Sequence, residues 1–194
     1  MVVVDIETTG LNPLESSIIE IGAVDFYNSD NKFNQRCKIR DDSFVNPMSL
    51  KVNGYTINDL RNSGFRSEKE LLINFISWLK NIDKRTIAGQ NVNFDLRFLN
   101  TTKDRENVEW DFGRRVVDIH SIAYAHMESR GLNPPLKIGT SRLNGDYIMK
   151  YVGIPLEPKP HKGINGAIYE TEALYRLMFN RNCFDEFKQY KLNF

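Results

Sequence analysis

The sequence predicts an α/β fold in which a mixed sheet of about five strands is flanked by helices. The run Met1–Thr8 is β-branched and apolar on both sides, as a central buried strand requires. Two further strand-like runs, Ser17–Tyr27 and Lys32–Arg40, are separated by the turn sequence NSDN, which favours an antiparallel hairpin. Beyond them, short apolar runs alternate with helical patterns, so parallel strands should complete the sheet.

Helices and short strands are also predicted beyond Arg40. Asp41–Phe65 is punctuated by Pro and Gly and is expected to be irregular. Ser67 and Glu70 form a capping box that should open a helix. The remaining expectations are a strand over Arg85–Gln90, a helix over Asn93–Asn100, a strand passing into a helix or loop over Arg114–Met127, a linker over Gly131–Gly139, a helix over Ser141–Ile154 that ends at Gly153, and a last helix near Asn165–Met178.

Length and composition predict one globular domain. The 194 residues favour a single domain at 1–180, with 181–194 as a tail that packs on it or serves for docking. Twenty-six basic residues balance 25 acidic ones, so any nucleic acid would be held locally, over a few phosphates. The apolar runs are too short to cross a membrane, and two cysteines without CxxC spacing are typical of a reducing compartment; we expect a cytoplasmic protein.

Asp5 and Glu7 stand at alternate positions of the first strand, so both carboxylates project from one face. Near the end of an apolar strand such a pair repels and is costly to bury unless a cation neutralises it. Oxygen ligands without a His or Cys cluster favour Mg²⁺ or Mn²⁺. The alternative is that the strand runs out into solvent, where both acids are hydrated.

Two neighbouring segments supply further candidates. The turn after the first strand contains Thr8, Thr9, Gly10 and Leu11, whose backbone amides are suited to a phosphate or a nucleotide end. Leu11 is also a candidate wedge against a terminal base. Asp95 lies on a helix that apolar neighbours hold to the core; taken alone, it would be read as a hydrated helix acid.

These motifs together resemble a known family. VVDIETTGL, AGQNVNFDLRFL and PHKGINGA occur in the order, and at about the spacing, of the DEDDh (DnaQ-like) exonucleases, which have the ribonuclease H-like fold. VVDIHSIA around Asp118 and SLKVNGYTINDL also resemble connecting segments of this family, so the likeness extends from Val2 to Leu177.

The resemblance implies a 3′→5′ exonuclease that releases nucleotides from single-stranded DNA or RNA ends with two Mg²⁺ or Mn²⁺ ions. It makes Asp5, Glu7 and Asp95 metal ligands and His161 the general base, roles that suit hydrolysis by two metals and an imidazole that titrates near neutral pH. A polymerase or another protein is an expected partner, and no membrane is involved. The expected substrate-binding residues are Thr8, Thr9, Gly10, Leu11, Asn91 and Phe94.

The last motif departs from the family. Gly166 stands where the resemblance expects a metal-binding Asp, and Gln90 stands where many members have His. Glu170 follows one helical turn later on the same face, leans toward the helix N-terminus, and should have open space over the glycine. We hypothesise that Glu170 supplies the missing carboxylate. Asn165 is a weaker substitute, and the alternative is a catalytically impaired module that binds nucleic acid or a polymerase-type partner.

Overall fold

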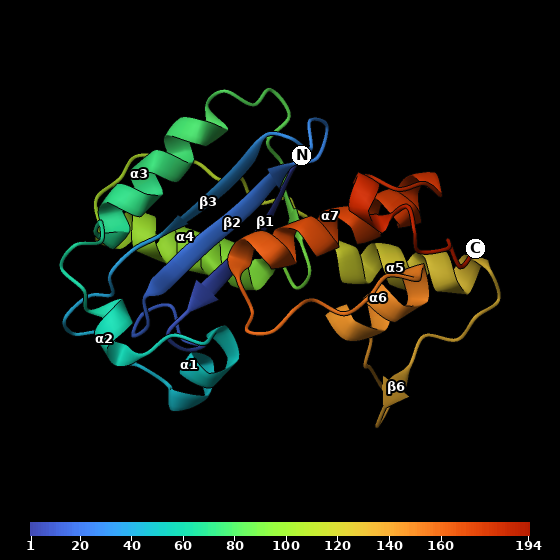
Figure 1. Cartoon of the computed structure of the whole chain (residues 1–194), viewed down its shortest axis with the longest axis horizontal. Helices are drawn as coiled ribbons and strands as arrows, with labels where there is room; N and C mark the ends of the chain where they lie inside the picture. Colours follow the sequence, from blue (N-terminus) through green and yellow to red (C-terminus); the bar gives the residue numbers. More distant parts are fainter.

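The computed structural model describes all 194 residues and contains the predicted mixed sheet, in the order β3-β2-β1-β4-β5 (Figure 1). β1, β2 and β3 are antiparallel, whereas β1, β4 and β5 run parallel. The predicted fold class is therefore confirmed. The strands are β1 Val2–Thr8, β2 Ile18–Asp25, β3 Lys32–Arg36, β4 Ile87–Gly89 and β5 Val117–Asp118.

Helices cover both faces of the sheet (Figure 1). One layer contains α3 Glu68–Leu79 and α4 Asn93–Arg105; the other contains α5 Ile119–Ser129, α6 Gly145–Val152 and α7 Gly163–Phe179. The peripheral elements are α1 Pro47–Asn53, α2 Ile57–Leu60, the hairpin of β6 Leu136–Lys137 and β7 Thr140–Ser141, and the 3₁₀ turn Asp185–Phe187. No helix has the length and apolar character needed to span a bilayer.

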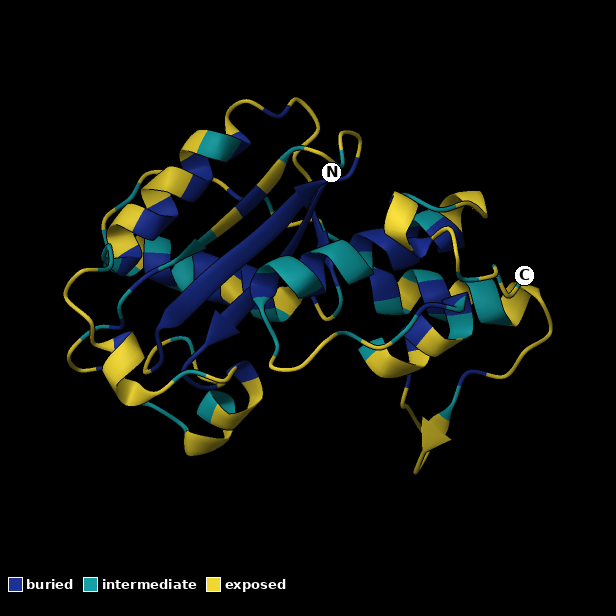
Figure 2. Ribbon diagram, viewed as in Figure 1, coloured by how far each residue is buried: buried dark blue, intermediate teal, exposed yellow.

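Alternation along β1 divides the core in two. Val2, Val4 and Ile6 pack with α3 and α4, whereas Met1 and Val3 pack with α5, α6 and α7. Strand β2 is buried along its whole length, as Figure 2 shows. This double burial explains why β1 reads as a continuous apolar run with only its carboxyl-terminal part acidic.

Two stretches are more regular than predicted. The expectation of irregular chain over Asp41–Phe65 is wrong, because α1 and α2 form there under local caps: the Asn46 side chain accepts from Met48 N–H, and Thr56 and Asp59 form a capping box. The Gly131–Gly139 linker contains β6, which pairs with β7 in an exposed hairpin. Both were missed because capping and pairing, rather than apolar periodicity, form these short elements.

The beginning of α7 lies directly on the sheet through two glycines. A Cβ on Gly22 would stand 1.9 Å from the carbonyl carbon of Gly163, and a Cβ on Gly163 would stand 2.7 Å from the Asp5 carbonyl oxygen. Side chains at either position would push the helix away. The glycine pair therefore brings the last sequence motif against the acidic end of β1.

Candidate active site

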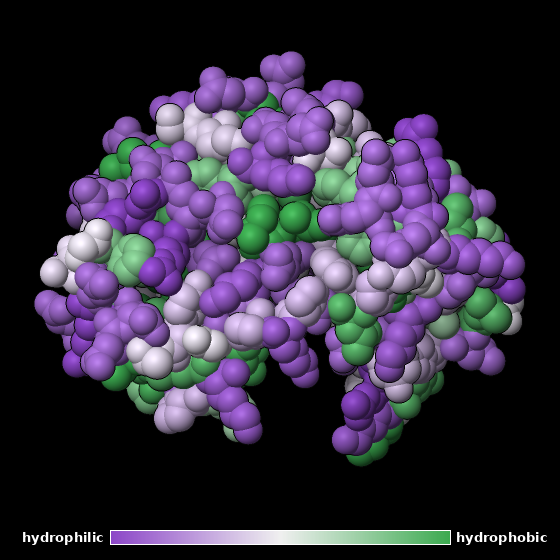
Figure 3. Space-filling view, in the orientation of Figure 1, coloured by the Kyte–Doolittle hydropathy of each residue, from purple (hydrophilic) through white to green (hydrophobic).

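A groove with a volume of about 370 Å³ lies at the carboxyl end of β1. Figure 3 shows a hollow in the surface on the side where this groove lies, between the α1–α2 region and the β6–β7 hairpin. The groove combines acids from three elements with one histidine. Its lining is Asp5, Ile6, Glu7, Asn144, Gly145, Asp146, Met149, Glu157, Lys159, His161 and Glu170.

Asp5 and Glu7 enter the groove from β1, on the same face as predicted. Neither carboxylate forms an ion pair. Burial raises the pKa of Asp5 well above its ordinary value, with further contributions from the Glu170 and Asp95 charges. Burial likewise raises the pKa of Glu7 to about 8, although Lys162 opposes the rise. The acids are thus not hydrated at the end of a strand.

Asp95 approaches the same end of β1 from the opposite face. It is 4% exposed, and its Oδ1 accepts a hydrogen bond of 3.1 Å from the Ile6 N–H. Burial raises its pKa to about 8, although the backbone hydrogen bonds oppose the rise. Asp95 is therefore a buried acid fixed to the strand between Asp5 and Glu7, and not a hydrated helix residue.

Glu170 reaches the groove from α7. Its Oε2 accepts a 3.1 Å hydrogen bond from the Gln90 N–H, just beyond the end of β4. Burial raises the pKa of Glu170 well above its ordinary value, and the charge of Asp95 adds to the rise. The chain thus supplies one N–H to this carboxylate and no ion-pair partner, while leaving Glu170 part of the lining beside Asp5.

The surroundings of Gly166 differ from the expectation that open space lies over the glycine. The three atoms nearest to a Cβ at this position all belong to Asp5, the closest being Oδ2 at 1.9 Å. The Asp5 carboxylate thus occupies the volume that a side chain at position 166 would fill. Because position 166 has no side chain, the Asp5 carboxylate fits there, and Glu170 lines the groove beside it.

His161 lies at the rim of the groove, and its side chain is 35% exposed. Its Nδ1 stands 2.9 Å from Glu157 Oε2, and the Glu157 side chain is only 9% exposed. Burial raises the pKa of Glu157, whereas the neighbouring His161 lowers it. The sequence reasoning missed Glu157, because it lies in a non-helical segment, with two prolines between it and His161, where no periodic spacing indicates that the two residues are in contact.

A second, more apolar groove adjoins the first and shares Ile6 and Glu7 with it. Its lining includes Thr8, Leu11, Met48, Val52 and Phe94. Leu11 is 73% exposed. Thr8, Leu11 and Phe94 therefore line one groove that continues from the acidic groove.

Three other predicted binding residues lie elsewhere. Thr9 is fully buried: its N–H donates to Ser17 O, and its hydroxyl donates to Phe44 O, so this residue fixes the loop from behind. Gly10 fits closely against Ser16, with an added Cβ 2.5 Å from Oγ. Asn91 is exposed at the turn into α4, in the left-handed region at φ 55°, and lines neither groove.

The chemistry of this donor set fits a hard divalent cation, because carboxylates that lack cationic partners are gathered in a buried site. As the side chains stand, no three His, Cys, Asp or Glu residues of the chain form a ready-made metal site. The hydrogen bonds from Ile6 and Gln90 engage one oxygen each of Asp95 and Glu170. The second oxygens of Asp95 and Glu170 and the carboxylates of Asp5 and Glu7, for which no side-chain hydrogen bond or ion pair is seen, are the groups that would hold an ion.

Fold and site together define a ribonuclease H-like nuclease architecture, with acids at the end of the central strand and a histidine before the last helix. Residues 2–166 match the family model described as an exonuclease. The chain belongs to this family, in its DEDDh, DnaQ-like branch.

Relatives of the chain include components of bacterial DNA polymerases. The DNA polymerase III subunit epsilon of Buchnera aphidicola is 33% identical over 184 residues, which cover 91% of this chain and 68% of that protein. A PolC-type DNA polymerase III of Pediococcus pentosaceus is 32% identical over 179 residues, covering 92% of the chain and 11% of the polymerase. The chain thus spans about a tenth of the length of such PolC-type relatives. The 3′-5′ DNA exonuclease Cap18 of Escherichia coli is 26% identical over 179 residues, covering 90% of the chain and 89% of Cap18.

Solved structures share the fold. Escherichia coli Exonuclease I in complex with a dA16 oligonucleotide has a TM-score of 0.71 at 20% identity, over 93% of this chain and 40% of that one. A zinc-bound form of the same exonuclease with single-stranded DNA has a TM-score of 0.70 at 18% identity, over 93% of this chain and 41% of that one.

Proposed function

We propose that the chain is a divalent-metal-dependent 3′→5′ exonuclease that removes nucleotides from single-stranded DNA ends. The observation that supports this most strongly is the groove in which Asp5, Glu7, Glu170 and His161 meet without a cationic partner for the acids. DNA is the favoured substrate because the related subunit epsilon and Cap18 act in DNA metabolism by name.

In this proposal Asp5, Glu7, Asp95 and Glu170 hold Mg²⁺ or Mn²⁺. Cations bound by such carboxylates lower the pKa of a water molecule and neutralise charge at the entering and leaving oxygens. Glu170 takes the role of the acid missing at position 166, while Gly166 leaves Asp5 its space. The adjoining apolar groove, with Leu11 and Phe94, holds the terminal bases by stacking.

His161 acts as the general base. With Nδ1–H donating to Glu157, the free Nε2 is the atom that takes a proton from the attacking water. The Glu157 carboxylate orients the ring and stabilises the imidazolium that forms. Glu157 is therefore a positioning residue in this scheme.

The role of Arg181–Phe194 also follows from its contacts. Phe184 and Phe187 are buried in the core beside α7, and Arg176 donates to the Phe187 and Tyr190 carbonyls. We assign this segment to the body of the exonuclease domain. A polymerase-type partner, suggested by the polymerase relatives, would then contact another surface.

Activity is tested with a 5′-labelled dT20 strand, Mg²⁺ or Mn²⁺, and EDTA as the stop. The expected result is a ladder of products shortened from the 3′ end that disappears with EDTA. If the folded chain leaves the strand intact with either metal, the enzyme assignment fails and the impaired binding module replaces it.

Glu170→Gln tests the relocated carboxylate. Because a metal ligand is removed, we expect at least the roughly 10–100-fold loss that follows from changing a ligand's supporting partner, with a weaker metal dependence. Glu128→Gln, an exposed change on α5, is the matched control. Equal rates and equal metal affinity in the two variants would contradict the role of Glu170.

A further inference from the structure

A groove with a volume of about 850 Å³ lies at the amino-terminal ends of the parallel strands, opposite the end at which the acids lie. Parallel strands β4 and β5 end at Gly89 and Asp118 beside the acidic groove, whereas the residues before them, Lys84–Thr86 and Arg114–Arg115, line this second groove. From Arg85 to Gln90 the extended chain spans about 16 Å. The two grooves are therefore separate sites on one rigid sheet.

The second groove is basic. Lys84, Arg85, Arg114 and Arg115 are all exposed, and none forms an ion pair with a carboxylate. Two acids also line it, Asp83 and Asp111, and Asp111 Oδ1 accepts from the Gly113 N–H. Since the whole chain carries a formal charge of only +1, this excess of unpaired cations is a local feature.

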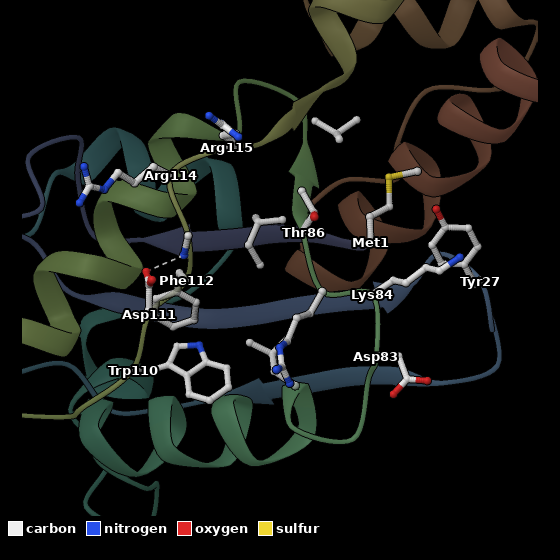
Figure 4. Close-up of a pocket in the computed structure, with 15 residues that line it drawn as sticks. Met1, Tyr27, Asp83, Lys84, Thr86, Trp110, Asp111, Phe112, Arg114 and Arg115 are labelled. Carbon is white, nitrogen blue, oxygen red and sulfur yellow. Dashed lines mark hydrogen bonds between the residues drawn. The ribbon is translucent and has the colours of Figure 1, made fainter.

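Aromatic rings stand among these cations. Arg85 Cζ lies 5.5 Å and Lys80 Nζ 5.8 Å from the centroid of the Trp110 ring, while Lys84 Nζ lies 4.9 Å from that of Tyr27, which is 56% exposed. Figure 4 shows Lys84 directed toward Tyr27, and Trp110 on the other side of the groove, while the side chains of Arg114 and Arg115 extend outward from its rim. The groove thus alternates positive charge with π surface.

We propose that this groove binds single-stranded nucleic acid outside the catalytic groove, with phosphates on the four cations and a base against Trp110. Unpaired strands are bound by this combination of cations that track the backbone and aromatic rings that accept bases. An acidic peptide would use the cations but not the rings. The ligand class rests on the proposed function, whereas binding itself requires no hydrolysis.

The distance between the grooves makes the proposal depend on strand length. A strand whose 3′ end lies in the acidic groove reaches the basic groove only when it is long enough to pass along the sheet. Long strands should therefore use both sites, and very short ones only the acidic groove.

The test measures binding of fluorescent dT20 and dT4 by anisotropy, with Asp5→Asn in every variant so that the strand is not consumed. Arg114→Ala with Arg115→Ala should weaken dT20 binding about 10-fold and reduce the slope of log K against log salt by about 1.4, because two phosphate contacts are lost. Binding of dT4 should be unchanged. Trp110→Leu should weaken dT20 binding about 5-fold or more.

The matched control is Lys69→Ala with Lys188→Ala, which removes two exposed cations outside both grooves. Thermal unfolding of each variant checks the fold. Equal dT20 affinity in the arginine variant and the control would overturn the proposal, as would equal losses for dT4 and dT20. A glutamate decamer that binds the same arginines more tightly than dT20 would assign the groove to a protein partner instead.

Hydrolysis is read separately, as shortening of dT20 by the wild-type chain with Mg²⁺ or Mn²⁺. Failure of that reaction would refute the exonuclease proposal, and the anisotropy measurements would still decide whether the basic groove binds a strand.

Discussion

Two glutamates, two residues apart on α7, have different surroundings: Glu172 is fully buried, whereas Glu170 is half-buried. Glu172 Oε1 accepts from Arg176 Nε at 2.8 Å, and its Oε2 accepts from the Cys183 and Phe184 N–H groups. Glu170 accepts one N–H, from Gln90, and no ion pair neutralises it. The helix turns about 200° between them, so they face different parts of the protein.

The difference separates a structural acid, Glu172, from the acid for which we propose a metal-binding role, Glu170. Arg176 neutralises Glu172 and also donates to the Val152, Phe187 and Tyr190 carbonyls, so this pair joins α6, α7 and the C-terminal segment. Glu170 instead adds uncompensated negative charge to a site that already contains Asp5. The presence of a cationic partner therefore distinguishes Glu172 from Glu170.

Among the substitutions that test the difference between Glu172 and Glu170, Arg176→Leu should have the largest effect. The substitution leaves Glu172 buried without its cation and several carbonyls without a donor, so the free energy of unfolding should fall by about 3–5 kcal/mol. Urea denaturation measures it. Arg97→Leu, an exposed change on α4, should alter stability by no more than about 0.5 kcal/mol. Similar midpoints for the two variants would show that the pair is not structural.

The unpaired acids should make stability depend on pH. Glu7 and Asp95 have pKa values raised from 4.5 and 3.8 to about 8, so between those values the folded state binds more protons than the unfolded state. In EDTA the free energy of unfolding should therefore fall as the pH rises from about 4.5 to about 8.

Asp95→Asn should reduce that slope by up to about 1.4 kcal/mol per pH unit, the value for one proton. Urea titrations across the pH range measure it. Added Mn²⁺ should flatten the wild-type curve at the upper end, because bound cations favour ionised acids. A slope that Asp95→Asn leaves unchanged would contradict the shifted pKa of this residue.

Gly166→Ala should reduce activity more than stability. The new Cβ requires the Asp5 carboxylate to turn away, and a misplacement of this size near reacting groups can reduce the rate about 100-fold. The thermal midpoint should change little, because alanine favours the helix by up to about 1 kcal/mol. Kinetics on dT20 and a melting curve give both quantities. Full activity in Gly166→Ala would exclude a role for the observed Asp5 position.

The smallest effect is expected from Glu157→Gln. Loss of a charge-assisted hydrogen bond of about 1.5–3 kcal/mol to His161 should lower kcat about 10- to 100-fold and shift its pH profile, with little change in KM. Glu157→Asp tests partial rescue. A purely structural role would lower the amount of folded protein without shifting the pH profile.

Much of this protein is determined by local sequence. The β-branched run of β1, the hairpin turn and the Ser67 capping box specify elements through interactions among near neighbours, and the structure contains all three. The i, i+2 spacing of Asp5 and Glu7 likewise fixes a shared face on any strand. The short capped helices α1 and α2 escaped prediction because a few hydrogen bonds, rather than periodic burial, define them.

Only the tertiary structure determines which other residues these side chains contact. The close contact between Gly22 of β2 and Gly163 of α7 brings Gly166 against Asp5. The N–H of Gln90, just beyond the end of β4, donates a hydrogen bond to Glu170. The basic groove joins Lys84–Arg85 to Arg114–Arg115, two segments that only the parallel pairing of β4 and β5 brings side by side. Local patterns fix which face a side chain occupies, but its partners lie far away in the chain. Which distant residues a side chain contacts depends on how closely the helices pack on the sheet.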